Sequence, residues 1–459
     1  MNYHAYRESL RKHHVPEWYN DAKLGIFIHW GLFSVPAFAV TGMSIVEARE
    51  KRNEEEYFRN NPYAEWYLNT LRISGSPTQN YHTKTYGDDF SYDNFVPIFN
   101  ESIKKWNPKE WANLFKKIGA KYVVLTTKHC DGFLLWPSKY PNPNKDDYII
   151  SRDIVGELSE AVKKEGMEMG FYYSSAWDWS FNLFPIKDNP SFSKHYIQTL
   201  EYTEYVTNHW YELIDKYKPK ILWSDMGYPF GKHPYEIFAD YYNKFPDGVV
   251  NDRWNQYIPE KNTFEMIRHK DFTTPEYMVF KEKRKRKWEV CRGIGNSFGY
   301  NKFETEENYL KSSDLIRMFI DIVSKNGNLL LNVGPTAEGQ IPEIQKRKLL
   351  ELGEWLDING EAIFGTRPWE RAEGTTLDGI SVRFTSKENI LFVVIMEKPK
   401  NNEVIIEDLN LEGISNVFLL GIKEKLDWSI ENSNLMIVIP KKIEDSPAIS
   451  FKIVLKIIK

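Results

Sequence analysis

Acidic side chains follow several short apolar runs of this 459-residue sequence, and Asp225 is the most distinctive of them. It follows the run 221–224, and Gly227 just beyond it lets the backbone turn away sharply. Cleavage of a glycosidic bond needs two carboxyl groups, one ionised to attack the sugar or activate water, the other protonated to donate to the leaving oxygen. Asp225 is the candidate for the ionised group, which a nearby cation such as Arg253 would keep charged. The alternative is that Asp225 only caps the next helix.

The second acid is harder to choose. Eight carboxyl side chains lie near predicted strand ends or loops: Glu65, Asp131, Asp178, Asp252, Glu265, Asp271, Glu276 and Glu289. Glu276 is surrounded in sequence by Phe272, Tyr277, Met278 and Phe280, and apolar neighbours favour the protonated carboxyl that a general acid needs. The alternative for Glu276 is an exposed loop glutamate.

The sequence contains none of the common motifs that bind a metal ion or a cofactor. His29 and His129 belong to no HxH or HExxH pair, and Cys130 and Cys291 form no CxxC pair. No GxSxG motif, phosphate-binding loop or GxGxxG motif between strand and helix is present. We therefore predict no metal and no cofactor, and exclude the common esterase, kinase and dinucleotide-binding classes.

The elements that must position these groups alternate between short apolar runs and helical patterns, from about residue 20 to 335. Seven buried strands are predicted, over 24–28, 121–127, 168–173, 221–224, 249–251, 288–291 and 328–333. Helices are predicted over about 107–119, 154–166 and 342–359. This alternation is typical of a (β/α)8-like barrel, whose active site lies at the carboxyl ends of the strands. The side chains predicted to meet there are His29, His129, Tyr172, Tyr173, Asp225, Asp252, Arg253, Arg292 and Asn332.

Beyond residue 364 the pattern changes to short alternating strands, in the runs 380–385, 390–396, 403–409, 417–422, 435–440 and 449–458. Six such strands in about 90 residues predict a β-sandwich. The predicted fold is therefore α/β, with a catalytic (β/α)8-like barrel over residues 1–362 and a C-terminal β-sandwich over 363–459.

Composition limits the partners. Lys and Arg number 60 against 64 Asp and Glu, so no overall charge favours nucleic acid or a membrane surface. The basic run 281–287 is interpreted as a solvated loop. Because the N-terminus has no signal-peptide pattern, no run approaches 20 apolar residues, and only two cysteines are present, we expect a cytoplasmic protein. The oligomeric state stays open, a homo-oligomer included.

Five long motifs also resemble a known family. They are WYNDAKLGIFIHWGLFSVP (18–36), NPYAEWY (61–67), TTKHCDGFLLW (126–136), ILWSDMG (221–227) and NLLLNVGPTAEGQIP (328–342). In order and spacing they are similar to the α-L-fucosidases of glycoside hydrolase family 29, over nearly the whole chain. The resemblance implies a barrel-like enzyme that needs no metal and hydrolyses terminal α-L-fucosyl residues of oligosaccharides or glycosides, with retention, through a covalent fucosyl-enzyme.

The same resemblance implies roles for individual residues. Asp225 matches the family's nucleophile, and Glu276, in FTTPEY, matches the acid/base of some members. The residues that match partners of the fucose hydroxyls are His29, Glu65, Trp66, His129, Tyr172 and Arg253. Fucose carries a methyl group at C5, and the positions that match its apolar recess are Phe27, Tyr63 and Phe298. Galactose has a hydroxyl there, which such a recess would leave unpaired.

Two features depart from the family pattern. Many members have two histidines where this chain has His129 followed by Cys130, so one hydroxyl contact is expected to be weakened or replaced by water. The charged insert 47–59 is interpreted as solvated helix, with a role at the pocket entrance as the alternative. Two other functions also stay open: a fucose-binding barrel protein without catalysis, and a related retaining glycosidase for another sugar, such as a galactosidase.

Overall fold

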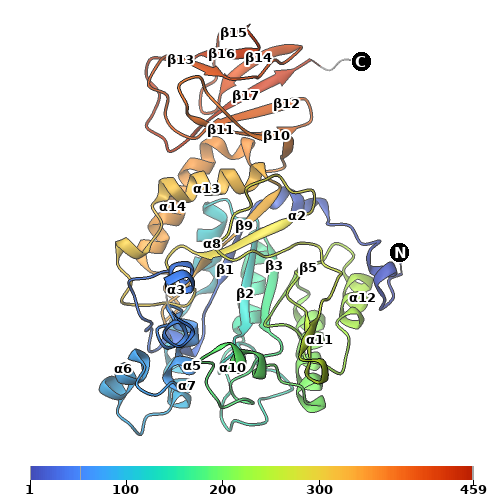
Figure 1. Ribbon diagram of the computed structural model, residues 1–459, viewed down its shortest axis with the longest axis vertical. Coiled ribbons are helices and arrows are strands. Elements are labelled where there is room, and N and C mark those ends of the chain that lie inside the picture. The colour runs from blue at the N-terminus through green and yellow to red at the C-terminus, as the bar shows by residue number, and fades with distance from the viewer. Residues whose placement is uncertain (1, 52, 457–459) are drawn as a thin grey trace.

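A computed structural model describes residues 2–51 and 53–456, which form a barrel-like domain and a smaller β domain stacked on one end of it (Figure 1). Seven parallel strands form a curled sheet in the order β5-β4-β3-β2-β1-β9-β8. Their bounds are β1 Leu24–Ile28, β2 Tyr122–Lys128, β3 Glu168–Ser174, β4 Ile221–Asp225, β5 Val249–Val250, β8 Trp288–Gly293 and β9 Gly327–Val333. All seven correspond to predicted strands, and the barrel-like fold class is confirmed.

An irregular segment, residues 271–277, lies between the two edge strands of this sheet. Its first amide donates to the Val250 carbonyl at 3.0 Å, and its last amide donates to the Cys291 carbonyl at 3.1 Å. The segment therefore takes the place of an eighth strand between β5 and β8. Pro275 has no amide hydrogen to donate to a regular ladder, which explains why the sequence predicts no strand here. Glu276 lies on this closing segment.

Helices surround the sheet on its outer side. The helices of the barrel wall are α8 Pro108–Lys117, α9 Ile154–Lys164, α11 Leu200–Tyr217, α12 Tyr235–Lys244, α13 Ser312–Ser324 and α14 Glu343–Asn359. The others are α1 Arg7–Leu10, α2 Glu17–Ala22, α3 Ile45–Lys51, α4 Glu54–Arg59, α5 Tyr67–Leu71, α6 Pro77–Tyr86, α7 Phe95–Ser102 and α10 Asn189–Lys194. The predicted helix that starts at Asn107 is capped locally, because the Asn107 side chain accepts from the Lys109 amide at 3.2 Å at the start of α8. None of the described helices is long and apolar enough to span a membrane.

The C-terminal domain contains two antiparallel sheets that enclose their own apolar core. One sheet has the order β10-β11-β12-β17-β14, and the other has the order β13-β16-β15. Their bounds are β10 Arg367–Thr375, β11 Ser381–Lys387, β12 Ile390–Ile395, β13 Glu403–Ile406, β14 Ile414–Leu419, β15 Trp428–Glu431, β16 Asn434–Val438 and β17 Ile449–Leu455. The two remaining strands, β6 Gln256–Ile258 and β7 Thr263–Glu265, form a separate hairpin in the barrel domain. The predicted sandwich is confirmed, although β10 and β15 were not predicted. Residues 457–459, at the predicted C-terminal end, lie outside the described residues.

A buried ion pair joins the end of β2 to the loop after β3, directly behind the carboxyl face of the sheet. The Lys128 ammonium donates to Asp178 at 2.9 Å, and both side chains are fully buried. Lys128 also lies 4.7 Å from the centre of the Tyr173 ring. The residues that follow the two ions, His129 and Trp179, are thereby held at the same end of the barrel.

Replacing Lys128 with Met should destabilise the protein by about 3–5 kcal/mol, because Asp178 would keep a buried charge without its partner. Urea unfolding followed by tryptophan fluorescence measures the change. The double variant Lys128→Met, Asp178→Asn removes both charges and should recover a large part of the loss. Equal unfolding midpoints for wild type and the single variant would contradict the assignment.

Candidate active site

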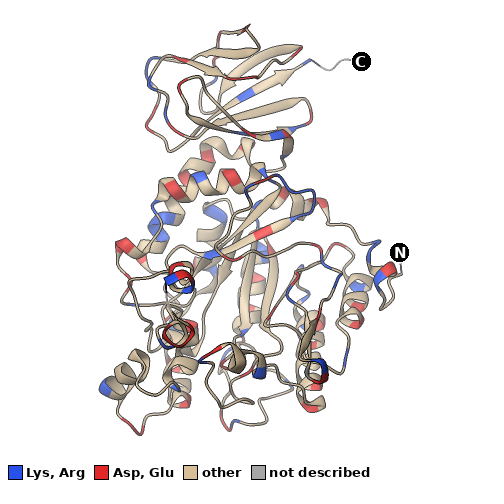
Figure 2. Ribbon diagram, viewed as in Figure 1, with Lys and Arg blue, Asp and Glu red and all other residues tan. Residues whose placement is uncertain are grey.

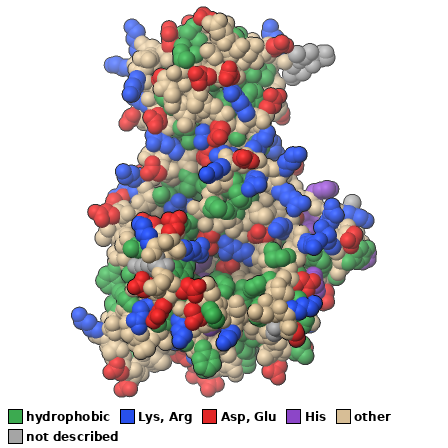
Figure 3. Space-filling view, viewed as in Figure 1, with side chains coloured by type: hydrophobic (Ala, Val, Ile, Leu, Met, Phe, Trp, Pro, Cys, Tyr) green, Lys and Arg blue, Asp and Glu red, His purple; other side chains and the backbone are tan. Residues whose placement is uncertain are grey.

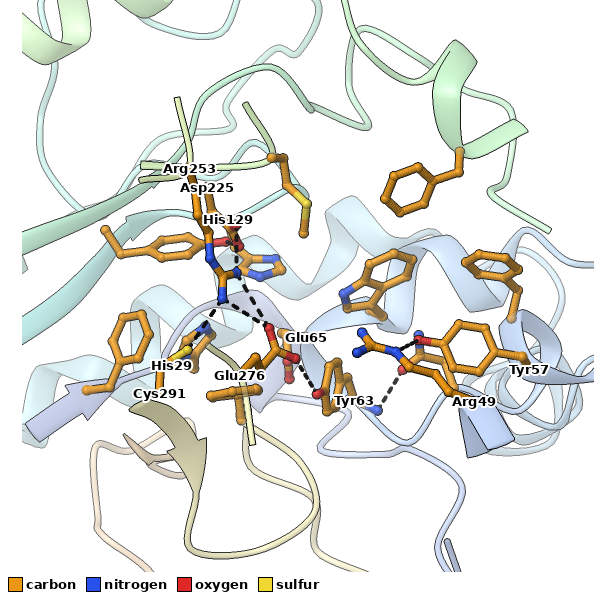
Figure 4. Close-up of a pocket in the computed structure, with 18 of the residues that line it drawn as sticks. His29, Arg49, Tyr57, Tyr63, Glu65, His129, Asp225, Arg253, Glu276 and Cys291 are labelled. Carbon is orange, nitrogen blue, oxygen red and sulfur yellow. Dashed lines mark hydrogen bonds and ion pairs between the residues drawn. The ribbon is translucent and has the colours of Figure 1, made fainter. Parts of the chain in front are cut away.

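A cavity of about 530 Å³ opens at the carboxyl ends of the parallel strands (Figure 4). The eleven side chains that the family resemblance assigned to catalysis or sugar binding all line it. They are Phe27, His29, Tyr63, Glu65, Trp66, His129, Tyr172, Asp225, Arg253, Glu276 and Phe298. Residues spread over more than half of the chain thus meet in one pocket, as expected at this end of a barrel.

Asp225 is the last residue of β4, and its carboxylate is held from two sides. Arg253 Nη1 donates to Oδ1 and the Tyr172 hydroxyl donates to Oδ2, both at 3.0 Å. The next two residues, Met226 and Gly227, have φ of 57° and 78°, so the backbone turns sharply, as the glycine predicted. A non-glycine residue at positive φ stores strain, a common feature of functional sites. The alternative role as a helix cap is excluded, because the next helix, α12, begins only at Tyr235.

Glu276 faces the same cavity from the closing segment. Its Oε1 accepts from the Tyr63 hydroxyl at 2.7 Å, and its Oε2 lies 3.5 Å from Nη1 and Nη2 of Arg253. Met278, expected to shield it, is 54% exposed. The predicted apolar setting of Glu276 is therefore wrong: a phenol and a guanidinium face the carboxyl group, because the segment passes next to Arg253 on its way along β8.

Arg253 lies between the two acids, and three further contacts fix it. Its Nε and Nη2 donate to the side chain and carbonyl of Thr274 at 2.9 and 3.0 Å. Its guanidinium lies 4.7 Å from the centre of the Trp223 ring, and the Trp223 indole donates to Glu289 at 3.1 Å. Glu289 is buried inside the barrel below the pocket. Its hydrogen bond thus helps to hold Trp223 in place under the guanidinium.

Most of the alternative acids lie away from the cavity. The six that do not line it are Asp131, Asp178, Asp252, Glu265, Asp271 and Glu289. Four of the polar residues predicted to meet at the strand ends are absent from the lining as well: Tyr173, Asp252, Arg292 and Asn332. Cys291, one residue before Arg292, lines the cavity instead, because side chains alternate between the two faces of a strand.

The two histidines of the site are buried and neutral at physiological pH. Burial lowers the pKa of His29 to about 4. Asn332 donates its amide to the Phe298 carbonyl at 2.7 Å, so its oxygen faces His29 Nδ1, also at 2.7 Å. His29 Nδ1 is therefore the donor, and Nε2 is left as an acceptor. Burial, with help from His29 and Lys128, lowers the pKa of His129 well below its usual value, and His129 Nδ1 has no hydrogen-bond partner among the described residues.

Glu65 is the most strongly perturbed acid of the pocket. Burial raises its pKa to about 8, although the Gly299 amide donates to its Oε2 at 2.7 Å. At neutral pH this carboxyl group is largely protonated, so it can donate as well as accept a hydrogen bond. Cys130, the departure from the family pattern, does not line the cavity; its thiol lies 3.2 Å from the Ser174 hydroxyl.

The charged insert forms the outer wall of the cavity, and its interpretation as solvated helix without a role is wrong. Helices α3 and α4 contribute Arg49, Glu54, Tyr57 and Phe58 to the lining. The Arg49 guanidinium donates to the Tyr57 hydroxyl at 3.3 Å (Figure 4). Glu54 accepts from the Asn189 amide at 3.1 Å, which connects α4 to α10 across the pocket.

These and six other lining residues were not predicted from the sequence. The full set is Arg49, Glu54, Tyr57, Phe58, Asn61, Asn189, Phe192, Trp223, Met226 and Cys291. The available signal was the aromatic pair at 57–58 within an otherwise charged insert. Among the described residues, no three His, Cys, Asp or Glu side chains are grouped so that they could hold a metal ion.

Comparisons with known proteins agree with this geometry. Two family models match the chain, "Alpha-L-fucosidase" over residues 1–361 and "Alpha-L-fucosidase C-terminal domain" over residues 378–458. The crystal structure of Thermotoga maritima α-fucosidase in complex with a mechanism-based inhibitor is 44% identical with a TM-score of 0.87, covering 98% of this chain and 100% of that one. An α-L-fucosidase of Dictyostelium discoideum is 33% identical over 91% of this chain and 85% of its own length. The tissue α-L-fucosidase of Homo sapiens is 33% identical over 94% and 87%.

The protonated Glu65 predicts a pH dependence of stability. In the folded state Glu65 keeps its proton up to about pH 8, whereas in the unfolded chain the same carboxyl group releases it near the ordinary pKa of glutamate. Between these two pH values, the contribution of Glu65 to the free energy of unfolding therefore falls as the pH rises. The Glu65→Gln variant has no carboxyl group at this position and so does not lose stability in this way as the pH rises. Its free energy of unfolding relative to wild type should increase by up to about 1.4 kcal/mol for each pH unit between about 5 and 8.

Urea unfolding at several pH values tests this, with Glu160→Gln, an exposed change on α9, as the matched control. The control should keep the wild-type pH dependence. A Glu65→Gln variant that follows the wild-type curve would mean that Glu65 is ionised in the folded protein.

Proposed function

The chain belongs to the α-L-fucosidases of glycoside hydrolase family 29, and from this premise we propose that it hydrolyses terminal α-L-fucosyl residues by double displacement, with retention of configuration. The observation that carries the proposal is the placement of two carboxyl groups on either side of one guanidinium. Asp225 Oδ1 and Glu276 Oε2 both contact Arg253 Nη1, at 3.0 and 3.5 Å.

This shared contact limits the separation of the two acids. The two oxygens are no farther apart than the sum of the two distances to Nη1. In retaining enzymes the carboxyl groups are about 5–5.5 Å apart, whereas inverting enzymes separate them by about 6.5–9.5 Å to admit a water molecule. The limit on this one oxygen pair reaches only the lower end of the inverting range, and this supports direct attack by one of the acids.

The reaction then has two steps. Asp225 attacks the anomeric carbon and forms a covalent ester, while Glu276 gives its proton to the glycosidic oxygen and the leaving group departs as an alcohol. Glu276, now a carboxylate, takes a proton from water as that water attacks the anomeric carbon and releases Asp225. Arg253 and Tyr172 hold the attacking carboxylate in position throughout. The mechanism-based inhibitor named for the Thermotoga maritima relative is compatible with a covalent step.

The inner half of the cavity has the chemistry to hold fucose. Neutral His29 offers an acceptor, His129 has an unpaired ring nitrogen, and protonated Glu65 can donate or accept, so sugar hydroxyls would find partners without burying net charge. The rings of Phe27 and Phe298 lie edge to face with centres 6.3 Å apart, and both contact His29. We assign this apolar corner, with the ring of Tyr63, to the C5 methyl group. Tyr63 also touches Glu276, and so connects sugar recognition to the acid.

The outer half of the cavity would then take the leaving group. Its walls are the aromatic rings of Tyr57 and Phe58 from α4 and of Phe192 from α10. Such rings suit the apolar faces of a sugar or an aryl group, and the insert is thereby assigned to leaving-group binding.

Replacing Asp225 with Gly should abolish turnover of 4-nitrophenyl α-L-fucoside, because no other described carboxylate contacts both Tyr172 and Arg253. Release of 4-nitrophenol measures the rate, and circular dichroism checks the fold. In the wild type, proton NMR should detect the α-anomer of fucose as the first product. Undiminished turnover by the variant would remove Asp225 from its role, and the β-anomer first would remove the double displacement.

Replacing Glu276 with Ala or Gln should separate substrates by their leaving groups. For a fucosyl disaccharide, kcat/KM should fall by about 10²–10⁴-fold, because a sugar alcohol needs a proton as it leaves. For an aryl fucoside with an acidic phenol, kcat/KM should fall by about tenfold or less. Added azide should raise kcat of the Ala variant and yield α-fucosyl azide, since azide attacks without a general base. Equal losses for both substrates would assign the proton transfer to another group.

A further inference from the structure

A second cavity, of about 760 Å³, lies at the opposite end of the barrel from the active site. It is formed by residues that precede β8, β9 and the closing segment, together with the N-terminal segment. Its charged lining includes Arg7, Arg11, Arg268, Lys270, Lys285 and Arg286. The last two belong to the basic run 281–287, and no residue of this cavity lines the active site.

The cations of this cavity have almost no partners. Within residues 2–51 and 53–456, the side chains of Arg7, Arg11, Arg268, Lys285 and Arg286 make no hydrogen bond, ion pair or ring contact. Lys270 has one distant carboxylate, 4.0 Å away on Asp252.

Among the described residues, Asp271 is the single acid of the lining, and its oxygens already have partners. One oxygen lies 2.9 Å from His13 Nδ1, and the other accepts from the Tyr242 hydroxyl and the Val250 amide, each at 2.8 Å. No described carboxylate therefore pairs with the guanidinium groups of the cavity or with the Lys285 ammonium group.

Three segments far apart in sequence bring these like charges together. Figure 2 shows the basic loop before β8 and the N-terminal segment on the same side of the molecule, and Figure 3 shows Lys, Arg and His side chains gathered there. The whole chain has a net charge of −4, so the concentration of positive charge is local. Like charges in a concave site raise the electrostatic free energy unless an anion is bound.

We propose that this cavity binds a small oligoanion carrying several sulfate or phosphate groups. Its volume falls in the range of small-molecule sites, and arginine presents paired donors that match the oxygens of sulfate and phosphate. A nucleic acid fits less well, because the described lining contains no aromatic ring other than those of histidines, and bases need such rings to stack on. The proposal does not depend on the reaction at the other end of the barrel.

Isothermal titration calorimetry of the full chain at low salt, with tripolyphosphate and with sucrose octasulfate as probes, tests the proposal. Lys285→Gln, Arg286→Gln should weaken binding by about tenfold or more, because charge-assisted contacts are lost. The matched control, Lys105→Gln, Lys109→Gln, removes two exposed cations elsewhere and should change Kd by less than about twofold. Hydrolysis of 4-nitrophenyl α-L-fucoside should be unchanged in both double variants.

Tighter binding of one probe identifies phosphate or sulfate as the preferred group, and either result supports the site. Three results would overturn it: no binding of either probe by the wild type, equal weakening in the control pair, or tighter binding of a single-stranded oligonucleotide of matched charge than of both probes.

Discussion

The arrangement of the active site depends on the position of one guanidinium. Arg253 lies between Asp225 and Glu276 and contacts both carboxyl groups. This contact requires the end of β4, the loop after β5 and the closing segment 271–277 to meet within a few ångströms. Closure of the barrel by an irregular segment, and not by an eighth regular strand, brings Glu276 to that point.

The parts of the site that the sequence predicted are those governed by local pattern. Buried parallel strands are continuous apolar runs, so the strand ends, and with them His29, His129 and Asp225, could be located. Which of two consecutive residues at a strand end points into the cavity is harder to predict, because the two side chains point to opposite faces. For this reason Arg292 was expected at the cavity, where Cys291 lies. Glu276 was favoured for apolar sequence neighbours that do not surround it in the fold, and its assignment, like that of the methyl recess, depended on the family resemblance. No period or spacing distinguishes one loop acid from another.

The features that the sequence did not predict arise from contacts between distant segments. The insert 47–59 has the composition of a solvated helix, yet Glu54 meets Asn189 more than a hundred residues away and thereby forms one wall of the cavity. The polar surroundings of Glu276 likewise come from Tyr63, on a distant loop. The basic cavity is a third example, because the charges at 7–11, 268–270 and 285–286 are separate in sequence. The net charge of the sequence does not reveal such clusters, because they form only when the chain folds.

The electrostatics of the sugar pocket are consistent with a neutral polyol as its occupant. Burial keeps His29 and His129 neutral and Glu65 protonated, so the ion pair of Arg253 and Asp225 lies on the cavity wall nearest the reacting bond. His129 Nδ1 has no partner among the described residues, and a buried polar atom without a hydrogen bond is unfavourable. A sugar hydroxyl would supply that partner and would bring no charge that the pocket must neutralise. Binding would thus satisfy polar groups that folding leaves unpaired, while the ions stay directed at the anomeric carbon, where charge develops in the transition state.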